Sequence, residues 1–139
     1  MKPLFQRVLH RFPIDCEIRG YYFTVTCQNS QQFYLAGYLG YNYRFDSNFI
    51  LDWDNSTREM QVKSKYDGRK IKIKHVFDDG DFPGVFLNEE YKNMRYDNKI
   101  VIDIGASIAD SALYFVLRGA KKFSVSSHFQ KYLQWPKKM

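Results

Sequence analysis

The stretch that most constrains the fold lies near the end of the chain and reads KIVIDIGASIADSALYFVLRGAKKF (residues 99–123). It begins with an uninterrupted apolar run of the kind found in strands that are buried on both faces of a parallel sheet. A glycine and small residues follow, and an amphipathic segment then ends at Gly119 with a cation in its last turn. This order predicts a β–α unit in which strand 99–104 pairs with a second strand at 123–126.

The residues before this unit have a different pattern, typical of short strands. The segments GYYFTVTC (20–27) and SNFILDW (47–53) are rich in aromatic and β-branched residues, which favour a pleated, half-buried surface. Between them, residues 31–45 are expected to contain a short helix. The side chains expected on its buried face are Phe33, Leu35, Ala36 and Leu39.

The clearest local prediction is a β-hairpin near residues 60–76. Apolar and polar residues alternate on both sides of Asp67-Gly68, and glycine accepts the positive φ that such a turn requires. One face of the hairpin is then apolar, and the other carries Lys63, Lys65, Lys70, Lys72 and Lys74. A row of lysines suits a nucleic-acid backbone, but we favour a solvated face that discourages edge pairing. Nucleic acid is therefore not an expected partner.

The two regions meet in the segment FDDGDFPGVFLNEEYKNM (77–94). Residues 77–84 have the composition of a loop, and residues 85–94 are expected to form a helix. We therefore divide the chain into a β-rich region (1–84) and a second region (85–139) that contains the β–α unit, which makes the fold class α/β. The acids of this segment, Asp78, Asp79, Asp81 and Glu89, are interpreted as solvated loop acids in preference to a cation site.

Composition excludes several classes of protein. A hydrophobic fraction of 45% is sufficient for a core. No apolar run approaches the roughly 20 residues of a membrane helix, and the first residues lack the apolar block of a signal peptide, so we expect a cytoplasmic protein with no membrane partner. Cys16 and Cys27 are expected to be free thiols, and no metal site is predicted because the histidines lack partners at ligand spacing.

The turn after strand 99–104 carries the candidate chemistry. The strand delivers Asp103 to its carboxyl end, where open α/β sheets place their ligands. Gly105 lacks a Cβ atom, so a ligand can approach the backbone closely. Ser107 or Asp110 is expected to cap the helix that follows. By itself this arrangement is equally typical of any β–α unit in a doubly wound sheet.

Three short elements follow one another in this unit: Asp103-Ile104-Gly105-Ala106, Asp110-Ser111 and Gly119-Ala120-Lys121-Lys122. Together they resemble the FkbM-like branch of the S-adenosylmethionine-dependent methyltransferases, in a form common in archaea. The resemblance is most specific over residues 85–123 and extends less specifically to most of residues 10–123. It implies the first β–α–β unit of a Rossmann-like methyltransferase sheet, with S-adenosylmethionine as cofactor and methyl transfer to an oxygen; the methyl acceptor is a small molecule that the sequence does not name.

The same resemblance implies which residues bind the cofactor. Asp103 would lie near its methionine end, Gly105 would let the turn approach it, and Ala106, Ser107 and Asp110 would line the same pocket; no catalytic residue is implied. Two positions depart from the family pattern. Ala109 replaces the glycine that precedes the second aspartate. Ser127 stands where the family has the acid that holds the ribose hydroxyls, and a neutral serine does not supply the charge-assisted contacts of a carboxylate.

Relative to the family pattern, the sequence is expected to be truncated at its C-terminal end. Strand 99–104 would then lack a neighbour on one side, and an unpaired apolar strand edge is a template for association. Two hypotheses follow. The chain is a shortened methyltransferase whose cofactor binding is weakened or lost, or it is a non-catalytic module that associates with itself through the free sheet edge.

Overall fold

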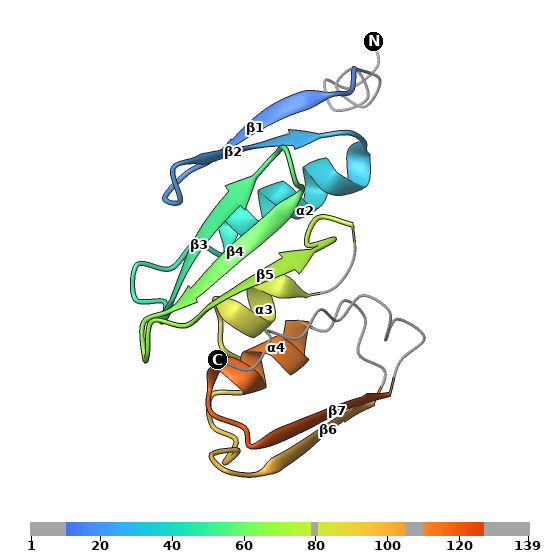
Figure 1. Cartoon of the computed structure of the whole chain (residues 1–139). Helices are drawn as coiled ribbons and strands as arrows, with labels where there is room; N and C mark the ends of the chain where they lie inside the picture. Colours follow the sequence, from blue (N-terminus) through green and yellow to red (C-terminus); the bar gives the residue numbers. More distant parts are fainter. Residues whose placement is uncertain (1–10, 79–80, 105–109, 127–139) are drawn as a thin grey trace.

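The computed structural model describes residues 11–78, 81–104 and 110–126. Within those ranges the protein is a mixed α/β structure with strands in three separate sheets (Figure 1). The strands are β1 (Ile14–Ile18), β2 (Phe23–Cys27), β3 (Phe49–Asp54), β4 (Glu59–Ser64), β5 (Lys70–Lys74), β6 (Ile100–Ile104) and β7 (Lys122–Ser126). The helices are α2 (Ser30–Tyr41), α3 (Phe82–Phe86) and α4 (Asp110–Leu117). The pairs β1–β2, β3–β4 and β4–β5 are antiparallel, whereas β6 and β7 are parallel.

The hairpin predicted near residues 60–76 is confirmed as β4 and β5. Alternation along both strands places one set of side chains in the core, namely Met60, Val62, Ser64, Ile71 and Ile73. Gly68 has a φ of +75° in the connecting turn, the left-handed conformation that glycine adopts without a steric penalty. On the outer face, Lys72 and Lys74 lie 3.5 and 3.7 Å from the Glu59 carboxylate, so part of the lysine row is neutralised within the sheet.

The helix expected within residues 31–45 is also confirmed, as α2. It begins after Asn29, whose side-chain oxygen accepts a hydrogen bond from the backbone N–H of Gln32 at 2.9 Å. Its buried face carries Ala36 and Leu39, while the expected Phe33 and Leu35 are half-buried. Helix α2 packs against β1 and β2.

The segment at residues 77–94 differs from its prediction. Helix α3 covers residues 82–86 only, so it begins inside the predicted loop and ends near the start of the predicted helix. Asp81 caps it by accepting a hydrogen bond from the N–H of Gly84 at 3.2 Å, and Pro83 fits its first turn because the missing N–H is not needed there. Three residues beyond its end, Glu89 has a φ of +47°, which does not continue a right-handed helix.

Strand β6 was expected to be buried on both faces, and this expectation is wrong. Helix α4 lies against one face of the β6–β7 pair (Figure 1), and Val101 and Phe123 pack against the core. The other face is open: the exposed fractions of Ile100, Ile102 and Ile104 are 65%, 67% and 82%. A continuous apolar run indicates a strand with apolar side chains on both faces, but it does not determine whether other elements pack against both of them.

A single hydrophobic core connects the β-rich region to the β–α–β unit. Phe49 of β3, Phe86 of α3 and Tyr114 of α4 meet with ring centroids 5.2 to 5.9 Å apart. A boundary between residues 84 and 85 falls within α3, which contacts both α2 and α4. In the ranges that the structure describes, no helix has the length and apolar character needed to cross a membrane.

Candidate cofactor site

The carboxyl end of β6 is held against the first turn of α4 by a side-chain contact. Asp103 is the penultimate residue of β6, and its carboxylate accepts a hydrogen bond from the Ser111 hydroxyl. Because β6 and β7 are parallel and α4 lies between them in the chain, residues 100–126 form a β–α–β unit. Asp103 therefore occupies the edge of the sheet at which parallel β–α units bind their ligands.

Asp110 has a different environment, although it is only seven residues away in the sequence. Its side chain is buried, and its two oxygens accept backbone hydrogen bonds from Ser111 at 2.9 Å and from Asp81 at 3.2 Å. Burial raises the pKa of the Asp110 carboxyl, while the hydrogen bonds from the backbone act in the opposite direction. One oxygen is thus engaged within the first turn of α4, and the other joins the start of α4 to the chain that precedes α3.

Three of the five predicted cofactor residues, Gly105, Ala106 and Ser107, lie outside the described residues, as do Ala109 and Ser127. The structure therefore describes the contacts on either side of the predicted turn, which are Asp103 with Ser111 and Asp110 with Asp81. The sequence motif assigns no role to Ser111, and Asp81 was expected to be a solvated acid. The Asp81–Asp110 contact depends on the approach of α3 to α4, for which the local sequence contains no signal.

Of the four acids interpreted as solvated, Asp79 lies outside the described residues, and the other three do not gather at one point. Asp78 accepts a hydrogen bond from the side chain of Gln32 at 2.7 Å, Asp81 caps α3, and Glu89 is buried behind the hairpin turn. Across residues 11–78, 81–104 and 110–126, no group of three or more His, Cys, Asp or Glu side chains is placed to hold a metal ion.

Glu89 was expected to be a solvated loop acid, and this expectation is wrong, because its side chain is buried. One oxygen accepts from the Asn48 amide at 2.7 Å, and the other lies 3.3 Å from the hydroxyls of both Tyr66 and Tyr114. These partners come from the start of β3, the hairpin turn and α4, so the carboxylate joins three segments of the core. Burial also raises the pKa of the Tyr114 phenol.

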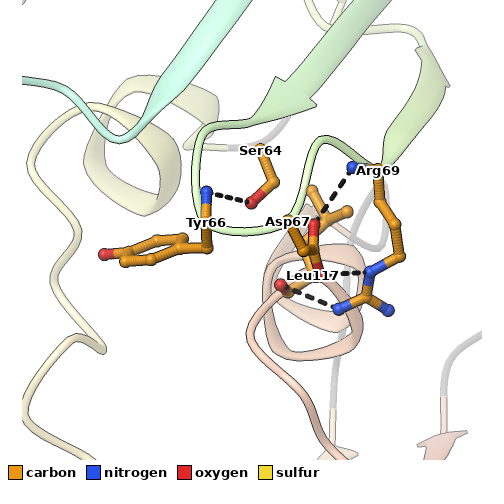
Figure 2. Close-up of polar contacts among 5 residues, drawn as sticks. All are labelled: Ser64, Tyr66, Asp67, Arg69 and Leu117. Carbon is orange, nitrogen blue, oxygen red and sulfur yellow. Dashed lines mark hydrogen bonds and ion pairs between the residues drawn. The ribbon is translucent and has the colours of Figure 1, made fainter.

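The end of α4 is fixed to the same hairpin turn. Figure 2 shows the Arg69 guanidinium donating to the backbone oxygen of Leu117 at 3.1 Å while its Nε pairs with Asp67 at 2.6 Å. The guanidinium of Arg118 stacks on the Tyr66 ring, 3.7 Å from its centroid, and its Nε donates to the Tyr96 hydroxyl at 2.8 Å. The β-rich region therefore positions α4, and α4 positions the carboxyl end of β6.

Comparison with known proteins adds no relative. No protein-family model, curated protein or solved structure matches the chain. The similarity of residues 85–123 to the FkbM-like methyltransferases therefore remains a hypothesis drawn from the residues themselves.

Proposed function

We propose that this chain binds S-adenosylmethionine at the carboxyl end of β6, as the cofactor-binding segment of a Rossmann-like, FkbM-like methyltransferase. The observation that carries the proposal is the position of Asp103, an acid at the end of the first strand of a parallel β–α–β unit. The motif elements within residues 85–123 support the same assignment through their resemblance to that family.

Asp103 is suited to contact the cofactor directly. Its carboxylate is half-exposed and accepts a hydrogen bond from Ser111, whereas an ionised carboxylate has about four acceptor positions. The remaining positions fit the amino group at the methionine end of the cofactor. The Ser111 hydroxyl orients the carboxylate, so that little conformational freedom is lost when the ligand binds.

Asp110 is suited to a positioning role, because both of its oxygens already accept backbone N–H groups. It would hold the start of α4 in place while the backbone of Gly105, Ala106 and Ser107, by resemblance, forms the wall of the pocket. The bound cofactor supplies an electrophilic methyl group, and the reaction proposed is its transfer to an oxygen of a small-molecule acceptor.

Calorimetric titration with S-adenosylmethionine and with its demethylated product tests this proposal. We expect binding with a Kd below about 1 mM, and an Asp103→Ala variant that binds at least about tenfold more weakly, because a hydrogen bond to a charged group contributes about 1.5–3 kcal/mol. Asp52→Ala is the matched control, since Asp52 is an exposed aspartate on β3. No heat at millimolar ligand, or equal weakening by both substitutions, would refute cofactor binding at this site.

A second proposal, of a different class, rests on the open face of β6. We propose that two copies of the chain associate along this strand, as a non-catalytic module would. Among the described residues β6 has β7 as its one hydrogen-bonded neighbour, so its other edge is available for pairing. The outer side chains of β7, Lys122 and Ser124, are polar, so the apolar row is confined to β6 itself.

An antiparallel arrangement about a two-fold axis at Ile102 suits this strand best. It places Ile100 of one copy beside Ile104 of the other, so that the two apolar rows are adjacent. A parallel arrangement would instead bring Lys99 beside Lys99 and would not form a closed two-fold contact.

Light scattering after size exclusion tests the association. We expect a concentration-dependent dimer that Ile102→Lys abolishes and Ile50→Lys leaves intact, because Ile50 is 49% exposed on the separate β3–β5 sheet. A wild-type monomer at high concentration, or a dimer that survives Ile102→Lys, would contradict the proposal. Cofactor binding is measured independently, so the two proposals fail separately.

A further inference from the structure

The β1–β2 hairpin carries two thiols that lie side by side. This hairpin and the β6–β7 pair are at opposite ends of the molecule (Figure 1). Cys16 lies on β1 and Cys27 on β2, both are free, and the Cys27 thiol donates to the Cys16 sulfur with 3.6 Å between the two Sγ atoms. Cys16 is half-buried, whereas Cys27 is fully buried beneath the hairpin. Neither thiol takes part in the contacts of Asp103 or Asp110.

The strand register places the two cysteines diagonally. Cys16 is opposite Val25, and Cys27 is opposite Ile14. Diagonal positions on an antiparallel pair have Cα atoms roughly 7–8 Å apart, slightly beyond the range of about 4.4–6.8 Å found in disulfides. The sulfur atoms are close enough to react, but an S–S bond between them would require the two strands to move closer together at this point.

We propose that Cys16 and Cys27 form a redox-active pair that a low-molecular-weight disulfide converts reversibly into an intramolecular disulfide. A disulfide under strain is easier to reduce than a relaxed structural one. The pair is therefore suited to switching between dithiol and disulfide, and unsuited to permanent cross-linking.

The reaction proceeds in two thiol–disulfide exchanges. The Cys16 thiolate attacks oxidised glutathione, forming a mixed disulfide and releasing one glutathione thiolate. Cys27 then attacks the Cys16 sulfur and breaks the mixed disulfide, and its proton passes to the departing sulfur of the second glutathione. In total, two protein thiols are oxidised to one disulfide, and one glutathione disulfide is reduced to two thiols.

The burial of the two thiols sets this order. Cys16 is the thiol that solvent reaches, so it meets the oxidant first. Burial, followed by the hydrogen bond to Cys16, raises the pKa of Cys27 to about 12, which suppresses its direct reaction with an external disulfide. Cys27 is therefore the resolving thiol, and its attack becomes effective because its target lies in contact with it.

Mass spectrometry of the full chain after acid quenching tests the assignment. With oxidised glutathione, the wild-type protein is expected to lose the mass of two hydrogens and to yield a cross-linked peptide pair containing Cys16 and Cys27. Cys27→Ser is expected to accumulate a glutathione adduct on Cys16, and Cys16→Ser is expected to remain unmodified. A stable adduct on wild-type Cys16, or no reaction of either thiol, would overturn the proposal.

Reversibility is tested on the oxidised wild-type protein. Titration with reduced glutathione at millimolar concentration is expected to restore both thiols, as counted by alkylation. A disulfide that resists this treatment would behave as a structural cross-link and would refute the switch. Far-UV circular dichroism of both serine variants shows whether they are folded, and the wild-type measurements do not depend on either variant.

Discussion

Replacement of Glu89 by alanine is the most informative test of how the two parts of the chain are joined. The Glu89 carboxylate accepts from the Asn48 amide and lies within hydrogen-bond reach of the Tyr66 and Tyr114 hydroxyls. Its removal leaves two enclosed donors without their acceptor, on the half-buried Asn48 and the fully buried Tyr114, whereas the Tyr66 hydroxyl belongs to a partly exposed side chain.

The expected magnitude follows from those two donors. A buried donor left without an acceptor costs about 1–3 kcal/mol, so with two such donors Glu89→Ala is expected to lower the free energy of unfolding by roughly 2–6 kcal/mol. The backbone makes no contribution to this difference, because alanine retains the penalty of the +47° φ that glutamate already has. Glu89→Gly relieves that penalty and is expected to be about 1 kcal/mol more stable than Glu89→Ala.

Urea unfolding followed by circular dichroism measures these differences, with Glu90→Ala as the matched control. Glu90 is the adjacent glutamate and is exposed, so its substitution is expected to change the free energy of unfolding by about 0.5 kcal/mol or less. Equal effects of the two substitutions would show that the Glu89 contacts do not stabilise the fold.

A double-mutant cycle with Tyr114→Phe tests the hydrogen bond itself. In the wild-type background, removal of the hydroxyl is expected to be destabilising, because the Glu89 carboxylate loses a donor. In the Glu89→Ala background the hydroxyl no longer donates to a carboxylate, so its removal is expected to cost less than in the wild type. The reasoning fails if Tyr114→Phe has the same cost in both backgrounds.

Two further predictions concern local conformation and pH. Gly68→Ala is expected to destabilise the protein by about 1 kcal/mol because the φ of Gly68 is +75°, whereas Gly37→Ala in α2 is expected to stabilise it by roughly 0.5–1 kcal/mol. Neither new Cβ atom meets another atom within 4 Å, so the difference comes from the backbone alone. Urea unfolding that gives the two variants the same stability would contradict this explanation. Burial raises the pKa of the Asp110 carboxyl above 3.8, so the folded protein binds the carboxyl proton more tightly than the unfolded chain does. The protonated carboxyl therefore stabilises the fold fully below pH 3.8, and this stabilisation is lost as the pH rises through the pKa of the folded state. The free energy of unfolding of the wild type should therefore fall relative to that of Asp110→Asn as the pH increases. A difference between the two proteins that does not change with pH would refute the raised pKa of Asp110.

Local sequence patterns were sufficient to predict the elements whose structure depends on residues close together in the sequence. The alternation on both sides of Gly68 determined the hairpin and the face it buries, because neighbouring strands and their turn lie within one continuous segment. The helix at residues 30–41 and the β6–α4–β7 order follow from periodicity in the same way. Of the candidate site, the sequence correctly placed Asp103 at the end of a parallel strand.

The segment at residues 77–94 shows where such patterns fail. Its helical periodicity competed with the Asp81 cap, with Pro83 and with a left-handed backbone at Glu89, and the result is a short helix in a different place. The left-handed backbone accompanies the burial of the Glu89 carboxylate against Asn48 and Tyr114, residues distant in the sequence. A pattern confined to 18 residues contains no information about those partners.

By itself, then, the sequence determined the β4–β5 hairpin, helix α2 and the β6–α4–β7 order, and it placed an acid at the carboxyl end of a parallel strand. The tertiary structure decided which polar groups are enclosed and which apolar face stays open: Asp110 and Glu89 are buried, while the isoleucines of β6 face solvent. Strand formation depends on a residue and its near neighbours. Burial depends on every segment that packs against it, and those segments meet only in the folded chain.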